Sequence, residues 1–199
     1  MTFETETHGR YEIKSGPLKG EWAANAYRHK SLVAKAVGSS REDAVESVKA
    51  GLARIEAIEL SERDEEGAPS AKEYERAFLE ILPRVSAGYI AMLRAHLAAP
   101  DQLISATKLA AAAGYEGYEG ANLHYGKLGC LLAEEIGFSP PTRADGTEIW
   151  TCSIARDPGL DTDFPETTFV DGLLRQMETG HFEWQMRPQV VQALRALGF

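Results

Sequence analysis

Side chains suited to reading nucleic acid gather in the segment GYEGYEGANLHYGKLG, residues 114–129. An asparagine can make two hydrogen bonds to an adenine, and histidine, tyrosine and lysine can reach base edges or phosphates. The candidate contact residues of this segment are Tyr115, Tyr118, Asn122, His124, Tyr125 and Lys127. The first two tyrosines have two interpretations, as half-buried anchors of a loop or as stacking platforms for bases.

Two helices must position these side chains. The first is expected in ISATKLAAAAG, with Ser105 as its N-cap and Gly114 ending it in a left-handed conformation. The loop GYEGYEG then precedes a second helix over residues 121–137. Strands expected at residues 148–155 and 182–186 complete the order of a winged helix-turn-helix, whose second helix enters the major groove of DNA. The expected apolar face of the second helix consists of Leu123, Leu128, Leu131, Leu132 and Ile136.

Two features of this segment weigh against DNA reading. The loop has seven residues, whereas three or four are usual between the helices of such a motif. Gly126 and Gly129 also suit a helical hairpin in which neighbouring backbones pack closely, since each interior glycine costs about 0.5–1 kcal/mol relative to alanine. A packed corner of a helical core is therefore the alternative interpretation.

The charge of the chain also weighs against DNA reading. The chain has a net charge of −9, and residues 100–199 contain seven Lys and Arg against fourteen Asp and Glu. Glu116 and Glu119 flank the start of the second helix, where a phosphate would lie, and Glu134 and Glu135 follow it. Because phosphate contacts dominate affinity for nucleic acid, an acidic module that docks a basic protein, or mimics DNA, is the rival hypothesis.

The N-terminal residues are neutral in sum and have strand character. Short alternating runs predict strands at 10–15, 20–27 and 31–37, and residues 39–60 predict a helix capped by Ser39 or Ser40. The expected apolar face of this helix is Ala44, Val45, Val48, Leu52, Ile55 and Ile58. A basic cluster near the turn between the second and third strands consists of Arg28, His29, Lys30 and Lys35. It has two interpretations, as a source of contacts to the nucleic-acid backbone or as an ordinary solvated turn.

The expected fold class is α+β, in four parts. Residues 1–60 form a β-β-β-α unit, residues 61–70 a linker, residues 71–99 connecting helices, and residues 100–199 a winged-helix-like domain. Pro83 should break or kink the connecting helices, since a proline inside a helix costs about 3 kcal/mol. We expect them to end before Pro100.

The string ISATKLAAAAGYEGYEGANLHYGKLG resembles a segment from the non-catalytic part of bacterial HNH-type restriction endonucleases. The matching residues are Thr107, Leu109, Ala110, Gly114, Tyr115, Ala121, Asn122, Leu123, Tyr125, Gly126, Leu128 and Gly129. Trp184 with MRPQVVQALRALG is similar to the end of that segment, so the resemblance spans roughly residues 100–199. It implies a DNA-associated accessory module, while the His-Asn-His nuclease itself is missing.

Signals for catalysis are weak. None of the five histidines stands in metal-ligand spacing, no phosphate-binding loop or nucleophile motif follows a strand, and we expect no metal or cofactor. Residues 157–163 suggest an acidic solvated loop; His96 and His181 suggest surface or helix-end positions; and Cys130 suggests a small buried side chain. An enzyme of unknown type remains a third hypothesis.

We expect a cytoplasmic protein without a membrane span, because only two cysteines occur and no apolar run reaches eighteen residues. The leading hypothesis is a non-enzymatic DNA-binding or DNA-sensing accessory protein of bacterial defence or regulation. Double-stranded DNA is the expected partner, with a separate protein partner and a homodimer as further possibilities.

Overall fold

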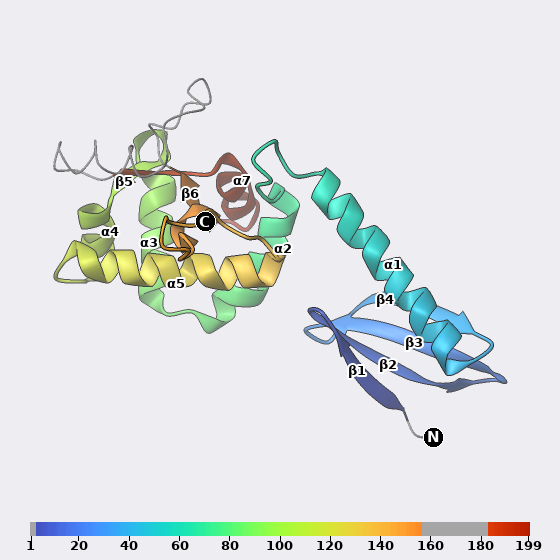
Figure 1. The fold of residues 1–199 in the computed structure, drawn as a ribbon. Coiled ribbons are helices and arrows are strands. Elements are labelled where there is room, and N and C mark those ends of the chain that lie inside the picture. Colours follow the sequence, from blue (N-terminus) through green and yellow to red (C-terminus); the bar gives the residue numbers. More distant parts are fainter. Residues whose placement is uncertain (1–2, 157–182) are drawn as a thin grey trace. The chain divides into compact units, whose positions relative to one another are not determined.

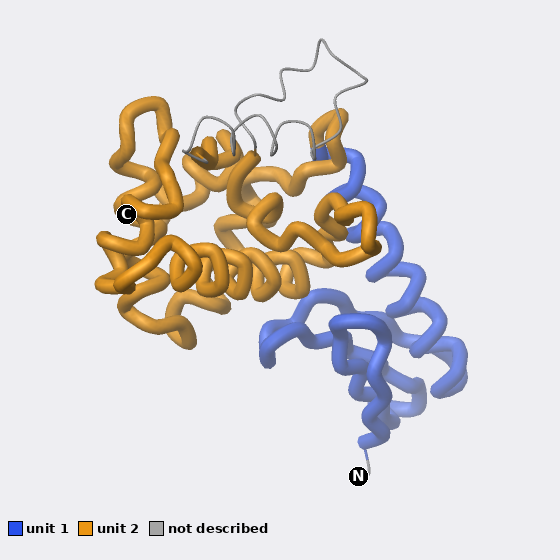
Figure 2. The backbone as a smooth tube through the Cα atoms, turned by 60° about the vertical axis from the view of Figure 1, so that its left-hand side comes forward, with its two compact units in different colours: residues 1–63 blue, residues 64–199 orange. Residues whose placement is uncertain are grey.

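The computed structural model describes residues 3–156 and 183–199, and the chain divides into two units at Arg63 and Asp64 (Figure 2). Each unit has its own buried apolar cluster. The fold class is α+β: a four-stranded antiparallel sheet with one helix, then a helical region with a small three-stranded sheet (Figure 1). None of the described helices is both long and apolar enough to cross a membrane.

Unit 1 is a meander of four strands followed by one helix. The strands are β1 (Glu4–His8), β2 (Tyr11–Leu18), β3 (Glu21–Arg28) and β4 (Ser31–Gly38), paired in chain order, and the helix is α1 (Arg41–Ser61). The expectation of three strands was therefore wrong by one. The missed strand, ETETH, alternates glutamate with β-branched threonine at a sheet edge and buries no apolar side chain, so it lacks the usual strand signal.

One face of this sheet packs on α1. Tyr11, Ile13, Ala24 and Ala26 of the sheet meet Ala44, Val45, Val48 and Leu52 of the helix. The expected apolar face is correct as far as Leu52, but Ile55 is half-buried and Ile58 is exposed. The helix, about 31 Å long, exceeds the strands, about 26 Å, so its last turns extend past the cluster.

Ion pairs join α1 to β1 and, through Arg10 and Glu59, to the turn between β1 and β2. Arg41 lies 2.9 Å from Glu4 and 3.1 Å from Glu6, and Lys49 lies 3.0 Å from Glu6. The hydrogen bond from Lys49 is the largest influence that lowers the pKa of Glu6. Exposed pairs of this kind contribute little stability individually, and here they link β1 to a helix that packs mainly against β4 and β3.

Unit 2 begins with two helices joined by a 3₁₀ turn. These elements are α2 (Ala71–Ile81), the 3₁₀ turn η1 (Leu82–Arg84) and α3 (Ala87–Ala98). Ser70 and Glu73 form a capping box at the start of α2. The helix breaks at Pro83 and α3 ends before Pro100, both as predicted from the sequence.

The remaining elements of unit 2 are three short strands, three helices and two 3₁₀ turns among the described residues. They are η2 (Pro100–Gln102), β5 (Leu103–Ser105), α4 (Ala106–Ala113), α5 (Tyr118–Ile136), η3 (Trp150–Ser153), β6 (Ala155–Arg156), β7 (Glu183–Met186) and α7 (Pro188–Ala196). The three strands form an antiparallel sheet in the order β5–β7–β6. The segment PETTFVDGLLRQME, residues 165–178, has a sequence that predicts a short helix, and it lies outside the described residues.

The expected strand at 148–155 is only partly correct. Residues 150–153 form the 3₁₀ turn η3, and only Ala155 and Arg156 pair with β7. The reason is tertiary, because the backbone at Trp150 packs directly on α5 at Gly129. The long helix α5 contributes Tyr125, Leu128 and Leu132 to the core of unit 2.

Candidate nucleic-acid interface

The turn between α4 and α5 is shorter than the sequence suggests. Ser105 caps α4 by accepting a hydrogen bond from the Lys108 N–H, and Gly114 ends it with φ 74°, both as predicted. Helix α5 already begins at Tyr118, so the connection consists of the four residues Gly114–Gly117. The expected seven-residue loop was wrong, because its last three residues form the first turn of α5.

Tyr115 and His124 are parts of one aromatic cluster. Their rings stack with centroids 4.7 Å apart, and the Tyr89 hydroxyl lies 3.3 Å from His124 Nδ1. Gly88 and Gly120 make room for Tyr115, since a Cβ at either position would come within about 3.2 Å of it. Desolvation, followed by the neighbouring Tyr115, raises the pKa of Tyr89. Tyr115 is therefore a half-buried anchor, and His124 is held against it.

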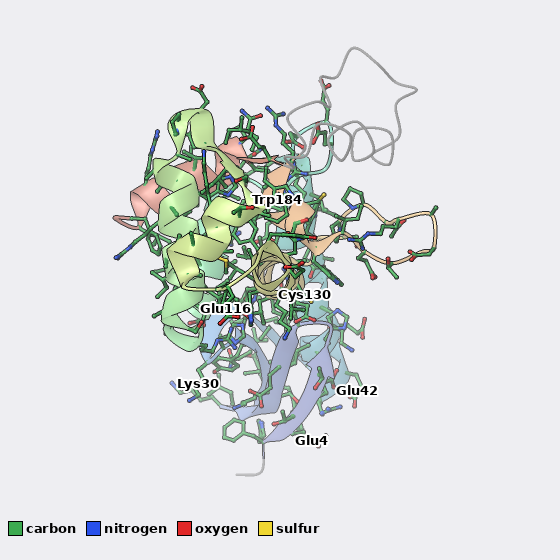
Figure 3. The ribbon with its side chains drawn as sticks, turned by 90° about the vertical axis from the view of Figure 1, so that its left-hand side faces the viewer. Glu4, Lys30, Glu42, Glu116, Cys130 and Trp184 are labelled. Atoms are coloured by element: carbon green, nitrogen blue, oxygen red, sulfur yellow. The ribbon has the colours of Figure 1, made fainter. Side chains whose placement is uncertain are left out.

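Tyr125 belongs to the core and not to a reading surface. Its ring is fully buried, stacks on Trp184 at 5.5 Å, and its hydroxyl lies 2.6 Å from His96 Nδ1. Figure 3 labels Trp184 inside unit 2. Burial raises the pKa of Tyr125 well above its ordinary value, so its hydroxyl stays a neutral donor. A DNA contact by Tyr125, as the sequence suggested, would require the core to open.

His96 was expected at a surface or helix end, and it lies in the last turn of α3 but away from the surface. The side chain is fully buried between α3, α5 and β7. Its Nε2 lies 3.0 Å from the Gln102 carbonyl and 2.9 Å from the Trp184 carbonyl. Burial lowers the pKa of His96 to about 4, so the ring is neutral. Its hydrogen bonds link the surrounding elements of the core.

The exposed side of α5 presents a mixed surface, which we call the outer ridge. Its residues follow at helical spacing: Glu119, Leu123, Lys127, Leu131 and Glu134. Leu123 is 56% exposed and Leu131 is exposed too, so the expected apolar face was wrong at both positions. The helix instead turns Ala121, Tyr125 and Gly129 inward. Lys127 is the only cation of this ridge.

Tyr118 and Asn122 lie next to the outer ridge at the start of α5, and both are exposed. Together with Lys127 they are the predicted contact residues of this segment that stand in solvent. Glu116 and Glu119 are exposed beside them. The structure therefore brings a candidate base reader and a candidate phosphate contact onto one helix, with carboxylates near its N-terminal end.

The two interior glycines of α5 differ. A Cβ at Gly129 would overlap the Trp150 carbonyl, so close packing explains this glycine, whereas a Cβ at Gly126 would meet no atom of the described residues within 4 Å. Gly126 is half-exposed, beside the outer ridge. The close-packing interpretation holds for Gly129 and does not account for Gly126.

Cys130 is half-exposed on α5 and not the buried side chain we expected (Figure 3). Its Sγ lies 3.5 Å from Glu134 Oε1. Partial burial, then Glu134 and Glu148, raise the pKa of the thiol, which makes it a poor nucleophile. No group of three metal-binding side chains occurs among the described residues, and residues 157–163 and His181 lie outside them.

The basic cluster expected in unit 1 lies partly at one end of its sheet. Arg28 ends β3, His29 and Lys30 form the β3–β4 turn with positive φ, and Lys35 is exposed in the middle of β4. Lys30 and Glu42 lie on opposite sides of this unit (Figure 3). The structure thus places Arg28, His29 and Lys30 at the turn, as expected, and Lys35 further along β4.

Comparison with known proteins found no matching family model, no matching curated protein and no matching solved structure. The resemblance to the endonuclease segment therefore rests on the residues that carry it.

Proposed function

We propose that the protein is a non-enzymatic DNA-binding or DNA-sensing accessory protein, with a winged-helix-like unit 2 that serves bacterial defence or regulation. The observation that carries the proposal is the α4–turn–α5 arrangement. A four-residue turn containing glycine joins the two helices, as in helix-turn-helix motifs. This removes the objection from loop length that the sequence raised.

The small sheet supports the same proposal. Strand β5 leads into α4, and β6 and β7 follow α5, so a strand pair comes after the second helix and β5 closes the sheet beside β7. This order is similar to that of a winged helix-turn-helix. In such domains the second helix reads the major groove, which here is α5.

Three exposed side chains of α5 have suitable chemistry. Asn122 can make a bidentate contact to adenine, Lys127 can contact a phosphate, and Tyr118 can reach either. Lys108, exposed in the first turn of α4, is a second phosphate contact on the helix that crosses the backbone. With so few cations, we expect modest affinity and a shallow salt dependence.

Titration of labelled duplex DNA, with and without methylated cytosine, tests the proposal at about 50 and 200 mM salt. Binding should weaken with salt, and Lys127→Ala should reduce the slope of log affinity against log salt by about 0.9, the share of one phosphate. Asn122→Ala should lower affinity for the preferred site by about 1–3 kcal/mol.

Lys72→Ala is the matched control, because it removes an exposed lysine from α2 and should leave the slope unchanged. Absence of duplex binding at 50 mM, or equal effects of Lys72→Ala and Lys127→Ala, would contradict the proposal.

The outer ridge favours a second candidate function, an acidic module that docks a basic protein. Exposed Leu123 and Leu131 are flanked by Glu119 and Glu134, with Lys127 between the leucines, a pattern suited to a protein partner. This candidate predicts no duplex binding. It also predicts a captured basic protein that is lost on Leu123→Glu and retained on Ile58→Glu, which alters an exposed residue of α1.

A further inference from the structure

The four-stranded sheet of unit 1 has one face that α1 leaves uncovered, which we call the open face. Strand alternation and register place on it Phe3, Thr5, Thr7, Glu12, Lys14, Gly16, Ala23, Asn25, Tyr27, Leu32, Lys35 and Val37. Phe3 is 63% exposed, and Leu32 and Val37 are exposed as well. No described residue of unit 1 outside this set packs over the face to form a buried cluster.

A polar row crosses the middle of the open face. The register aligns Thr5 with Lys14, Lys14 with Asn25, and Asn25 with Lys35, one residue from each strand. Lys14 is 3.2 Å from Glu12 and lies over the Tyr27 ring. Lys35 has no ion-pair partner within the part of the chain that the structure describes. The row offers hydrogen-bond donors and positive charge on a flat surface.

Two aromatic rings flank the polar row. Phe3 lies across Gly16, where an added Cβ would come within 2.6 Å of the ring, so glycine lets the ring rest on the backbone of β2. The other side of the ring is open, as its exposure shows. Tyr27 lies on the opposite side of the polar row from Phe3. It pairs with Glu12, which is four residues, or about 13 Å, from Gly16 along β2.

The β3–β4 turn adds basic residues under backbone strain. His29 and Lys30 have φ values of 46° and 72°, a conformation in which Asn-Gly is preferred. A left-handed residue other than glycine costs about 1–2 kcal/mol. Strain of this kind tends to persist where it serves function, and here it retains a lysine that Asn-Gly would remove.

Charge in unit 1 differs between its two sides. On the α1 side, Glu4, Glu6 and Glu59 are bound by Arg41, Lys49 and Arg10. On the open face and its turn, Lys14 pairs with Glu12, whereas Lys30 and Lys35 have no ion-pair partner among the described residues. A polyanion is therefore the complementary ligand.

We propose that the open face binds single-stranded DNA, with a base stacked on the exposed ring of Phe3 and phosphates at Lys35 and Lys30. Aromatic platforms combined with lysines are the means by which sheets bind unpaired strands. A duplex does not offer free base faces to such rings, and lysine is depleted at the centre of protein–protein interfaces. The choice of DNA rests on the proposed function.

The experiment measures anisotropy of a labelled 12-nucleotide single strand, its duplex and the same sequence as RNA, with the full chain at about 50 and 200 mM salt. Phe3→Ala should weaken single-strand binding about ten-fold. Lys35→Gln should lower the slope of log affinity against log salt by about 0.7. Neither variant should change duplex binding through α5.

Ile58→Ala and Lys72→Gln are the matched controls, an exposed apolar residue of α1 and an exposed lysine of α2, and both should bind the single strand as wild type does. Absence of single-strand binding at 50 mM would overturn the proposal, as would binding that survives Phe3→Ala together with Lys35→Gln. Tighter binding of RNA than of DNA would overturn the choice of DNA.

The two proposals fail separately. Duplex binding that depends on Asn122 and Lys127, without single-strand binding, would overturn only the role of the open face. Single-strand binding that depends on Phe3, without duplex binding, would overturn the function proposed for α5 and support the open face.

Discussion

His96 joins three elements of unit 2 through both nitrogens of its ring. The two carbonyls beside Nε2, of Gln102 and Trp184, can only accept, so Nε2 carries the proton. Nδ1 then accepts from the Tyr125 hydroxyl at 2.6 Å. A second proton on Nδ1 would place a charge in the core and oppose this hydrogen bond. The neutral ring is thus the form that the fold requires.

Acid should therefore destabilise unit 2 through His96. Its pKa is about 4 in the folded chain and near 6.5 when unfolded, so the unfolded state binds the proton first. The contribution of His96 to stability is complete above pH 6.5 and is lost as pH falls towards 4. Between pH 7 and pH 5 the loss should be about 2 kcal/mol.

Urea unfolding at these two pH values measures the loss. In a Trp22→Phe background, fluorescence reports on Trp150 and Trp184, which both lie in unit 2. His96→Gln should be less stable at pH 7 but should show a pH dependence about 2 kcal/mol smaller. If both proteins lost the same stability on acidification, His96 would not be the titrating group.

At the scale of elements, alanine substitutions at the two interior glycines of α5 should change the stability of unit 2 in opposite directions. Gly126→Ala should stabilise unit 2 by about 0.5–1 kcal/mol, because alanine favours helix and the site is open. Gly129→Ala should destabilise it strongly, because the methyl group would overlap the Trp150 carbonyl. Urea unfolding of both variants at pH 7 tests this. A destabilising Gly126→Ala would show that this position is packed.

A less strained β3–β4 turn should raise the stability of unit 1 and weaken single-strand binding. Replacing His29 and Lys30 by Asn-Gly relieves two positive-φ side chains and should stabilise unit 1 by about 1 kcal/mol or more. The same change removes a lysine and should weaken single-strand binding. Thermal unfolding followed by Trp22 fluorescence, in a background with Trp150→Phe and Trp184→Phe, measures the first effect. An unchanged midpoint would argue that the turn is not strained.

Local signals predicted most elements, and tertiary contacts account for the errors. Ser40, Ser70 and Ser105 cap helices that begin where the sequence placed them within two residues. Strand β1 was missed because it buries no apolar side chain, and its place depends on ion pairs to α1. The partners of His96 stand up to 88 residues away, so no local pattern could reveal them.

In the candidate site, too, local signals predicted some residues correctly and tertiary contacts account for the errors. Asn122 and Lys127 were predicted from residue chemistry alone, and both are exposed on α5. Tyr125 shares that chemistry but faces inward, because it continues the buried row of Leu128, Leu132 and Ile136 at helical spacing, whereas Leu123 lies off that row. The open face could not be predicted without β1, since Phe3 and Thr5 gain their positions by pairing with β2.

At the scale of the whole chain, each unit has its own buried apolar cluster, and an independent core is what defines a domain. A cavity in one cluster should therefore loosen mainly the unit that contains it. Leu52→Ala in unit 1 and Leu128→Ala in unit 2 are matched changes, since both leucines are fully buried. Each should cost about 2–5 kcal/mol.

Hydrogen exchange followed by mass spectrometry resolves the two responses by peptide. Leu52→Ala should speed exchange in peptides of β2, β3 and α1, and Leu128→Ala should do so in peptides of α2, α3 and α5. Peptides of the other unit should exchange as in the wild-type chain, because their own core is intact. Equal acceleration in both units from either variant would mean that the chain unfolds as one cooperative structure, and the two proposed nucleic-acid surfaces could then not be tested independently by destabilising variants.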